Sequence, residues 1–129
     1  MFPEGFEAVD FDGAIRILAD DRRIVRVLRQ TFGDDLIVGA RDAMRANDYD
    51  SGLGNEVYGF LMDEMMNEAK EVWSGKINRT HDSYGVGVSQ YLSVFYVHAV
   101  DYDNYGFFTN IEAAKGWIFS NWGGDVEED

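Results

Sequence analysis

The sequence predicts an α+β domain with three to four helices in the N-terminal half, a small antiparallel sheet of two to three strands over about 84–108, and a closing C-terminal helix over about 110–122. Apolar residues recur at helical spacing up to Trp73, which indicates amphipathic helices. From Tyr84 onward, β-branched and aromatic residues alternate or run together, as strands require. Helices followed by adjacent strands form segregated layers, which defines the α+β class.

The composition indicates one acidic domain. The 129 residues are 46% hydrophobic and 15% aromatic, which is enough apolar surface for one core, so we expect a single α+β domain over residues 1–129. The chain has no cysteine, which excludes disulfides, thiolate metal sites and a cysteine nucleophile. No apolar run approaches the roughly 20 residues that span a bilayer, and residues 1–12 are acidic, so we expect a cytoplasmic protein.

The charge balance restricts the partners that this protein can bind. Acidic residues outnumber basic ones 24 to 11, and the net charge is -13. Nonspecific nucleic-acid binding needs cations that displace the phosphate counterions, so we expect no direct nucleic acid ligand and no anionic membrane ligand. The acidity is also compatible with plain solubility or with a salty cytoplasm.

The first helical segment has both a start signal and a stop signal. Asp10 or Asp12 is placed to cap its N-terminus, and Gly33 is placed to end it. The Asp20 and Asp21 pair is a point at which this helix can break in two. The sequence therefore predicts one long helix or two short ones before Gly33.

A second helical segment follows, and then a loop. Asp34 or Asp35 begins this segment, where a carboxylate suits the positive end of the helix dipole, and the apolar spacing continues through Met44. Residues 47–55 are rich in Asn, Asp, Ser and Gly, which predicts a loop.

The clearest helical period covers Glu56 to Trp73. Its apolar residues fall on one arc, which we predict to face the core. The residues of this arc are Tyr58, Leu61, Met62, Met65, Met66, Ala69, Val72 and Trp73. Methionines on a surface can form an adaptable binding groove, but at this spacing we interpret them as core residues.

The strand region begins after Gly75. Val86 and Val88 alternate with glycines, and residues 91–100 are expected to form one largely buried strand. A turn over 101–104 leads to a short third strand at 105–108.

The last helix has a predicted capping box. The hydroxyl of Thr109 is expected to accept from the amide of Glu112, whose carboxylate reaches back. Gly123 and Gly124 end this helix, and residues 125–129 are expected to be a solvated acidic tail.

Residues 101–112 resemble a calcium-binding loop in spacing only. Asp101 and Asp103 stand at the first two ligand positions and Glu112 at the last, but Tyr105 replaces an oxygen ligand and no incoming helix is expected. A turn with a capping box explains the same residues. We therefore predict no metal and no cofactor, with Asp101, Asp103 and Glu112 as the weak alternative.

No catalytic group is predicted. The two histidines, His81 and His98, do not stand at a zinc-ligand spacing, and His98 shares a strand face with Val94 and Tyr96, which favours a packed histidine. Ser89 and Ser93 lack the G-x-S-x-G turn that positions the nucleophile of many hydrolases. The sequence therefore favours a protein that is not an enzyme.

A row of carboxylates opposite the apolar arc is the candidate partner-binding surface. Between Asp63 and Glu71 the carboxylates span about 12 Å of helix axis, a spacing comparable with that of phosphates on a nucleic-acid strand. A large apolar ring, Phe60, lies among them and is a candidate anchor. The full set comprises Asp48, Asp50, Glu56, Phe60, Asp63, Glu64, Glu68 and Glu71. The alternative is a solvated helix face with Phe60 covered by a neighbouring loop.

These observations favour a small acidic binding or inhibitor protein that occludes the basic, nucleic-acid-binding surface of a partner. A nuclease or defence complex is the expected partner, by analogy with phage-encoded inhibitors and immunity proteins, and the host cytoplasm is the expected location if the protein is phage-encoded. A self-associating structural or accessory domain, for example a homodimer, is the second hypothesis, because the chain has nine Phe, seven Tyr and three Trp. The third is a divalent-metal enzyme or calcium-binding module that uses Asp101, Asp103, Glu112 and His98.

Overall fold

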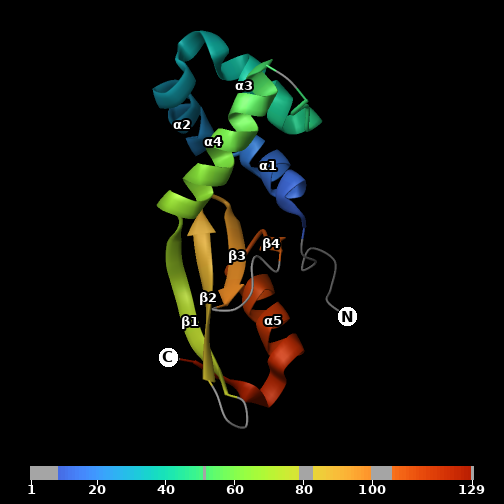
Figure 1. The fold of residues 1–129 in the computed structure, drawn as a ribbon, viewed down its shortest axis with the longest axis vertical. Helices are drawn as coiled ribbons and strands as arrows, with labels where there is room; N and C mark the ends of the chain where they lie inside the picture. Colours follow the sequence, from blue (N-terminus) through green and yellow to red (C-terminus); the bar gives the residue numbers. More distant parts are fainter. Residues whose placement is uncertain (1–8, 51, 79–82, 100–105, 129) are drawn as a thin grey trace.

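The computed structural model describes residues 9–50, 52–78, 83–99 and 106–128 (Figure 1). It confirms the α+β class, with four N-terminal helices, a five-strand antiparallel sheet and a C-terminal helix. The four helices gather at one end of an elongated molecule, and the sheet with the last helix forms the other end.

The first two helices begin and end where the sequence predicts. α1 (Phe11–Ala19) is capped by Asp10, whose Oδ1 accepts from the Gly13 amide at 2.8 Å. The chain breaks at the predicted aspartate pair, and α2 (Arg23–Phe32) follows. Gly33 ends α2 with a φ of 84°, a conformation that glycine adopts at little cost.

The break between α1 and α2 is held by one buried carboxylate. Asp21 Oδ1 accepts from the Arg23 backbone amide at 2.9 Å and from Arg23 Nε at 3.0 Å. The side-chain hydrogen bond from Arg23 lowers the pKa of Asp21 to about 2, against the opposing effect of burial. The ionised carboxylate therefore accepts from the first backbone amide of α2 and stabilises the start of that helix.

The remaining N-terminal helices differ from prediction mainly at their ends. A short 3-10 turn, η1 (Asp34–Leu36), precedes α3 (Ile37–Ala46), and α3 ends at Asn47 in a left-handed conformation with a φ of 52°. α4 (Gly52–Glu68) begins inside the segment predicted to be a loop.

The predicted helix over Glu56 to Trp73 is too long. α4 ends at Glu68, and β1 (Lys70–Asn78) begins after a single residue, so Val72 and Trp73 lie on a strand. β-branched and aromatic residues favour strands, and β1 gains hydrogen bonds to strands on both sides. Distant pairing therefore outweighs the local helical period.

The predicted sheet is too small and one of its strands is wrong. β2 (Ser83–Tyr91) and β3 (Val94–Ala99) form a hairpin, so residues 91–100 are not one strand. The chain turns at Leu92, which adopts the positive φ (51°) that tight two-residue hairpins need. β4 (Phe107–Phe108) pairs with β3, and the sheet order is β4-β3-β2-β1-β5.

The C-terminal segment also departs from expectation in two places. α5 (Ile111–Trp122) is capped by Asn110, whose Oδ1 accepts from the Ala113 amide at 2.8 Å, so the cap is not Thr109. Asparagine is a stronger cap than threonine, which explains the shift by one residue. After the 3-10 turn η2 (Gly123–Asp125), β5 (Val126–Glu128) joins the sheet beside β1, so the acidic tail is not a free terminus.

The structure has two apolar cores that meet at the sheet. One face of the sheet packs on α5 and buries the first core, which comprises Trp73, Ile77, Val86, Val88, Val97, Phe108, Ala113, Ala114 and Ile118. The second core lies among α1 to α4. The end of the β2–β3 hairpin, with Tyr91 and Val94, belongs to this second core and contacts the helices. The hairpin thus ties the two ends of the molecule together.

Two glycines of α4 give opposite predictions for the same substitution. A Cβ at Gly59 meets no atom within 4 Å, so Gly59→Ala should raise the free energy of unfolding by about 0.5–1 kcal/mol through helix propensity. A Cβ at Gly54 would lie 1.7 Å from the Asp48 carbonyl oxygen, so Gly54→Ala should lower it by about 2 kcal/mol or more. Urea denaturation of both variants checks this, and equal effects would contradict the placement of α4.

The lowered pKa of Asp21 predicts that the stability of the protein depends on pH. Its pKa is lower in the folded state, so its stabilising effect is present above the ordinary pKa of 3.8 and is lost as the pH falls towards about 2. Asp21→Asn should lower the free energy of unfolding by about 1–2 kcal/mol at neutral pH, after allowance for solvent screening, and by much less in acid. Urea denaturation at both pH values, with Asp35→Asn as the exposed control, measures the difference. A loss that does not change with pH would contradict the carboxylate's role.

Candidate functional site

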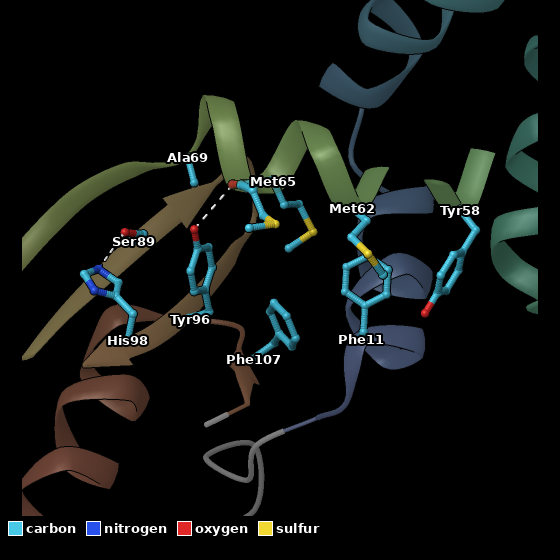
Figure 2. Close-up of a pocket in the computed structure, with 10 residues that line it drawn as sticks. Phe11, Tyr58, Met62, Met65, Ala69, Ser89, Tyr96, His98 and Phe107 are labelled. Atoms are coloured by element: carbon cyan, nitrogen blue, oxygen red, sulfur yellow. Dashed lines mark hydrogen bonds between the residues drawn. The ribbon is translucent and has the colours of Figure 1, made fainter. Parts of the chain in front are cut away.

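A pocket lies between α4 and the sheet face opposite α5 (Figure 2). Its volume is about 640 Å³, and its walls come from α1, α4, Ala69 and strands β2 to β4. The lining residues are Phe11, Tyr58, Met62, Met65, Met66, Ala69, Ser89, Tyr96, His98 and Phe107. These residues are far apart in sequence. The turn from helix to strand at Ala69 and the hydrogen bond from the Tyr96 hydroxyl to the Met65 carbonyl bring the end of α4 beside the sheet.

The apolar part of the pocket has a rigid aromatic side. The Phe11 ring meets Tyr58 edge to face at 5.2 Å and Phe107 at 5.8 Å, between ring centroids. Tyr96 lies 5.7 Å from Phe107 and continues this wall towards the sheet. Such edge contacts hold the rings in place and keep the wall formed without a ligand.

The methionine side of the pocket corrects one interpretation of the sequence. Met65 is buried, as expected, but Met62 is 40% exposed and Met66 is 75% exposed. Both were predicted to be core residues, and they line the pocket instead. The helix turns less of its apolar arc towards the core than its spacing suggests, because the core direction is set by Val57 and Leu61, which are fully buried.

The polar end of the pocket is formed by adjacent strands. The Ser89 hydroxyl and His98 Nε2 are 2.9 Å apart, and Glu71 Oε2 lies 3.6 Å from the same nitrogen (Figure 2 shows the first pair). The register explains this grouping, because Ser89 pairs with Glu71 on one side and with Tyr96 on the other. Glu71 was predicted on the helical acidic face, and its position on β1 corrects that.

Gly87 is necessary for this arrangement. A Cβ at this position would lie 2.6 Å from His98 Cε1 and 2.8 Å from Glu71 Oε2. The side chains of His98 and Glu71 therefore meet directly above the backbone of Gly87, which has no side chain of its own. The glycine was assigned to a strand from sequence, but its role depends on the side chains of His98 and Glu71, which are 11 and 16 residues away.

Ser89, His98 and Glu71 do not have the arrangement of an acyl-transfer triad. In a serine–histidine–carboxylate triad the serine and the acid contact opposite ring nitrogens, whereas Ser89 and Glu71 both approach Nε2. Burial raises the pKa of Tyr96, which keeps its hydroxyl neutral, and that hydroxyl donates to the Met65 carbonyl at 3.3 Å. The polar end thus offers hydrogen-bonding groups without an activated nucleophile.

The predicted acidic surface is distributed along α4 and beyond it. Glu56, Asp63 and Glu68 are exposed on α4. Glu64 is half-buried, and its carboxylate accepts from the Tyr91 hydroxyl at 3.3 Å. Burial raises the pKa of Tyr91, and the Glu64 charge adds to the shift, so this tyrosine remains a donor.

The loop acids lie at the N-terminal end of the same helix. Asp48 and Asp50 are exposed, and the loop that carries them packs on the first turns of α4, where Asn55 Nδ2 donates to the Tyr49 carbonyl at 3.3 Å. The structure therefore places Asp48, Asp50 and Glu56 at one end of α4.

The ring proposed as an anchor is partly covered. Phe60 is half-buried and meets Phe32 of α2 edge to face, with 5.6 Å between ring centroids. The alternative for Phe60 was cover by a neighbouring loop; the ring is partly covered, but by helix α2.

Of the acids that the structure describes, four outside α4 are paired with arginines. Arg23 pairs with Asp21 at 2.8 Å, and Arg45 lies 3.3 Å from Asp20. Further pairs join Arg29 to Asp34 and Arg45 to Asp42. Within the described ranges, no lysine or arginine lies within 4.0 Å of a carboxylate on α4.

The weak metal candidate falls largely outside the described residues. Asp101 and Asp103 are not among them, and Glu112 is exposed in the first turn of α5. Among the described residues there is no group of three or more His, Asp or Glu side chains that could hold a metal ion. Likewise, no helix in the described part of the chain is long and apolar enough to cross a membrane.

No family model, curated protein or solved structure matches this chain. Two features of its described surface remain as candidates for recognition. One is the row of unpaired carboxylates on α4, and the other is the pocket beneath that helix.

The polar end of the pocket gives a prediction for Gly87. Gly87→Ala should displace His98 and Glu71 and break the Ser89–His98 contact, while the free energy of unfolding falls by only about 1 kcal/mol because both side chains can turn into solvent. Ring chemical shifts of His98 report the displacement. Ser89→Ala is the control, because it removes the same contact without adding an atom. Unchanged His98 shifts in both variants would contradict this geometry.

Proposed function

We propose that this protein is a non-catalytic binding protein that uses the α4 carboxylates to cover a basic, nucleic-acid-binding surface on a partner protein. The observation that carries the proposal is the run of exposed acids along α4: Glu56, Asp63 and Glu68 have no lysine or arginine within 4.0 Å among the described residues. By contrast, arginines pair with Asp20, Asp21, Asp34 and Asp42. The cytoplasm is the proposed location, and a host cytoplasm if the protein is phage-encoded.

Unpaired surface carboxylates are suited to attracting a cationic partner. The charge of a paired surface carboxylate is largely neutralised by the neighbouring cation. An unpaired carboxylate keeps its full charge and its free hydrogen-bond acceptors. With a net charge of -13, the whole molecule adds a long-range attraction that speeds encounter with a basic surface.

The dimensions of the row support competition with nucleic acid. Glu56 to Glu68 spans about 18 Å along the helix axis at 1.5 Å per residue, and the loop acids extend one end. Lysine and arginine surfaces that bind phosphates also bind carboxylates, and arginine makes two hydrogen bonds to either. The proposed mechanism is therefore occlusion, in which carboxylates occupy the positions of phosphates. A nuclease or a defence complex has a surface of this chemistry.

Charge reversal on α4 tests this proposal. The variant E56K/D63K/E68K should fail to capture a basic partner from an extract of the native host, while wild type captures one that duplex DNA or RNA releases. Glu64 is left unchanged because it contacts Tyr91. Capture by wild type should weaken steeply as salt rises, since screening shortens the range of the attraction.

The matched control is D35K/E112K/D125K, which has the same net charge but changes exposed acids on other elements. It should retain the partner. Equal loss in the two variants would contradict a role for α4 specifically, and a captured partner that nucleic acid does not release would contradict occlusion of a nucleic-acid site.

A further inference from the structure

We infer that the pocket between α4 and the sheet is a binding site for a small hydrophobic amine. Its apolar group would lie among the aromatic rings and methionines, and its ammonium group would lie at the end lined by Ser89 and His98 (Figure 2). The Glu71 carboxylate lies beside this end, 3.6 Å from His98 Nε2, although Glu71 is not one of the lining residues. This inference does not depend on the proposed function, because the exposed α4 acids do not line the pocket.

The volume and walls suit a small molecule. About 640 Å³ lies within the range of roughly 300–1,000 Å³ that is usual for such sites. One wall is formed by aromatic rings in mutual edge contact, and the other by methionines, which adapt to the shape of a ligand. A bound apolar group would remove Met62 and Met66 from water, where they now expose 40% and 75% of their surface.

The polar end selects the charge of the ligand. The Glu71 carboxylate beside His98 only accepts hydrogen bonds, the Ser89 hydroxyl can accept as well as donate, and an ammonium group donates three. The Tyr96 hydroxyl already donates to the Met65 carbonyl, so it is not available to an anionic ligand. No lysine or arginine lines the pocket.

The surrounding charges and rings add to this preference. Aromatic faces attract cations, and Tyr96 and Phe107 stand beside the polar end. A carboxylate ligand would meet Glu71 and the field of a molecule with a net charge of -13. The amine is therefore the occupant to which the charge of the site is complementary.

Three probes of equal shape test the inference: phenylbutylamine, phenylbutanol and phenylbutanoate. Titration calorimetry on the full chain should show the amine binding at one saturable site, about tenfold more tightly than the carboxylate, with the alcohol between them. Glu71→Gln should reduce the affinity for the amine to that for the alcohol and leave alcohol binding unchanged.

A second pair of variants tests the apolar wall. Met62→Ser with Met66→Ser should weaken all three probes about fivefold by removing apolar area without adding charge. Val38→Ser is the control, because Val38 is 72% exposed on α3 and lies outside the pocket. The variant E56K/D63K/E68K should retain amine binding, which separates this inference from the proposed function.

Three outcomes would overturn the inference. The first is absence of saturable binding by any probe to the folded wild type, and the second is tightest binding by the carboxylate. The third is a concentration-dependent dimer in sedimentation that the methionine variant dissociates, which would make a second copy of this chain the occupant.

Discussion

The arrangement of this molecule depends on one covalent constraint: a single residue, Ala69, separates the end of α4 from the start of β1. With so short a connection, the last turn of the helix lies next to the start of β1 at one end of the sheet (Figure 1). Met65, Met66 and Ala69 line the pocket together with residues of β2 and β3. The pocket, its methionine wall and the approach of Glu71 to His98 all follow from this junction. The acids of α4 are held on the outer side of the same helix.

The junction is stabilised from both sides by contacts distant in sequence. β1 is hydrogen-bonded to β2 along its length and to β5 at its end, and the buried Trp73 donates from Nε1 to Glu128 at 2.7 Å. On the helical side, Leu61 and Met65 are buried with the end of the hairpin. If α4 continued past Glu68, β1 would lose hydrogen bonds to its neighbouring strands. If β1 began earlier, α4 would lose buried contacts in the helical core.

The sequence predicted the helix ends that are determined by contacts within a few residues. Asp10 caps α1 and Gly33 ends α2 through contacts within a few residues, and both were identified. Val72 and Trp73 were assigned to a helix because they continue its period, while the contacts that hold Trp73 in a strand come from Val88 and Glu128, 15 and 55 residues away. The polar end of the pocket was missed for the same reason, and only the exposure of the α4 carboxylates was predictable.

The junction can be measured directly by NMR on the full chain in solution. Secondary chemical shifts should be helical up to Glu68 and extended from Lys70, with cross-strand nuclear Overhauser effects between Glu71 and Ser89. Helical shifts that continue through Trp73, with contacts at helical spacing between Ala69 and Trp73, would contradict the junction. In that case neither the pocket nor its polar end would exist as described.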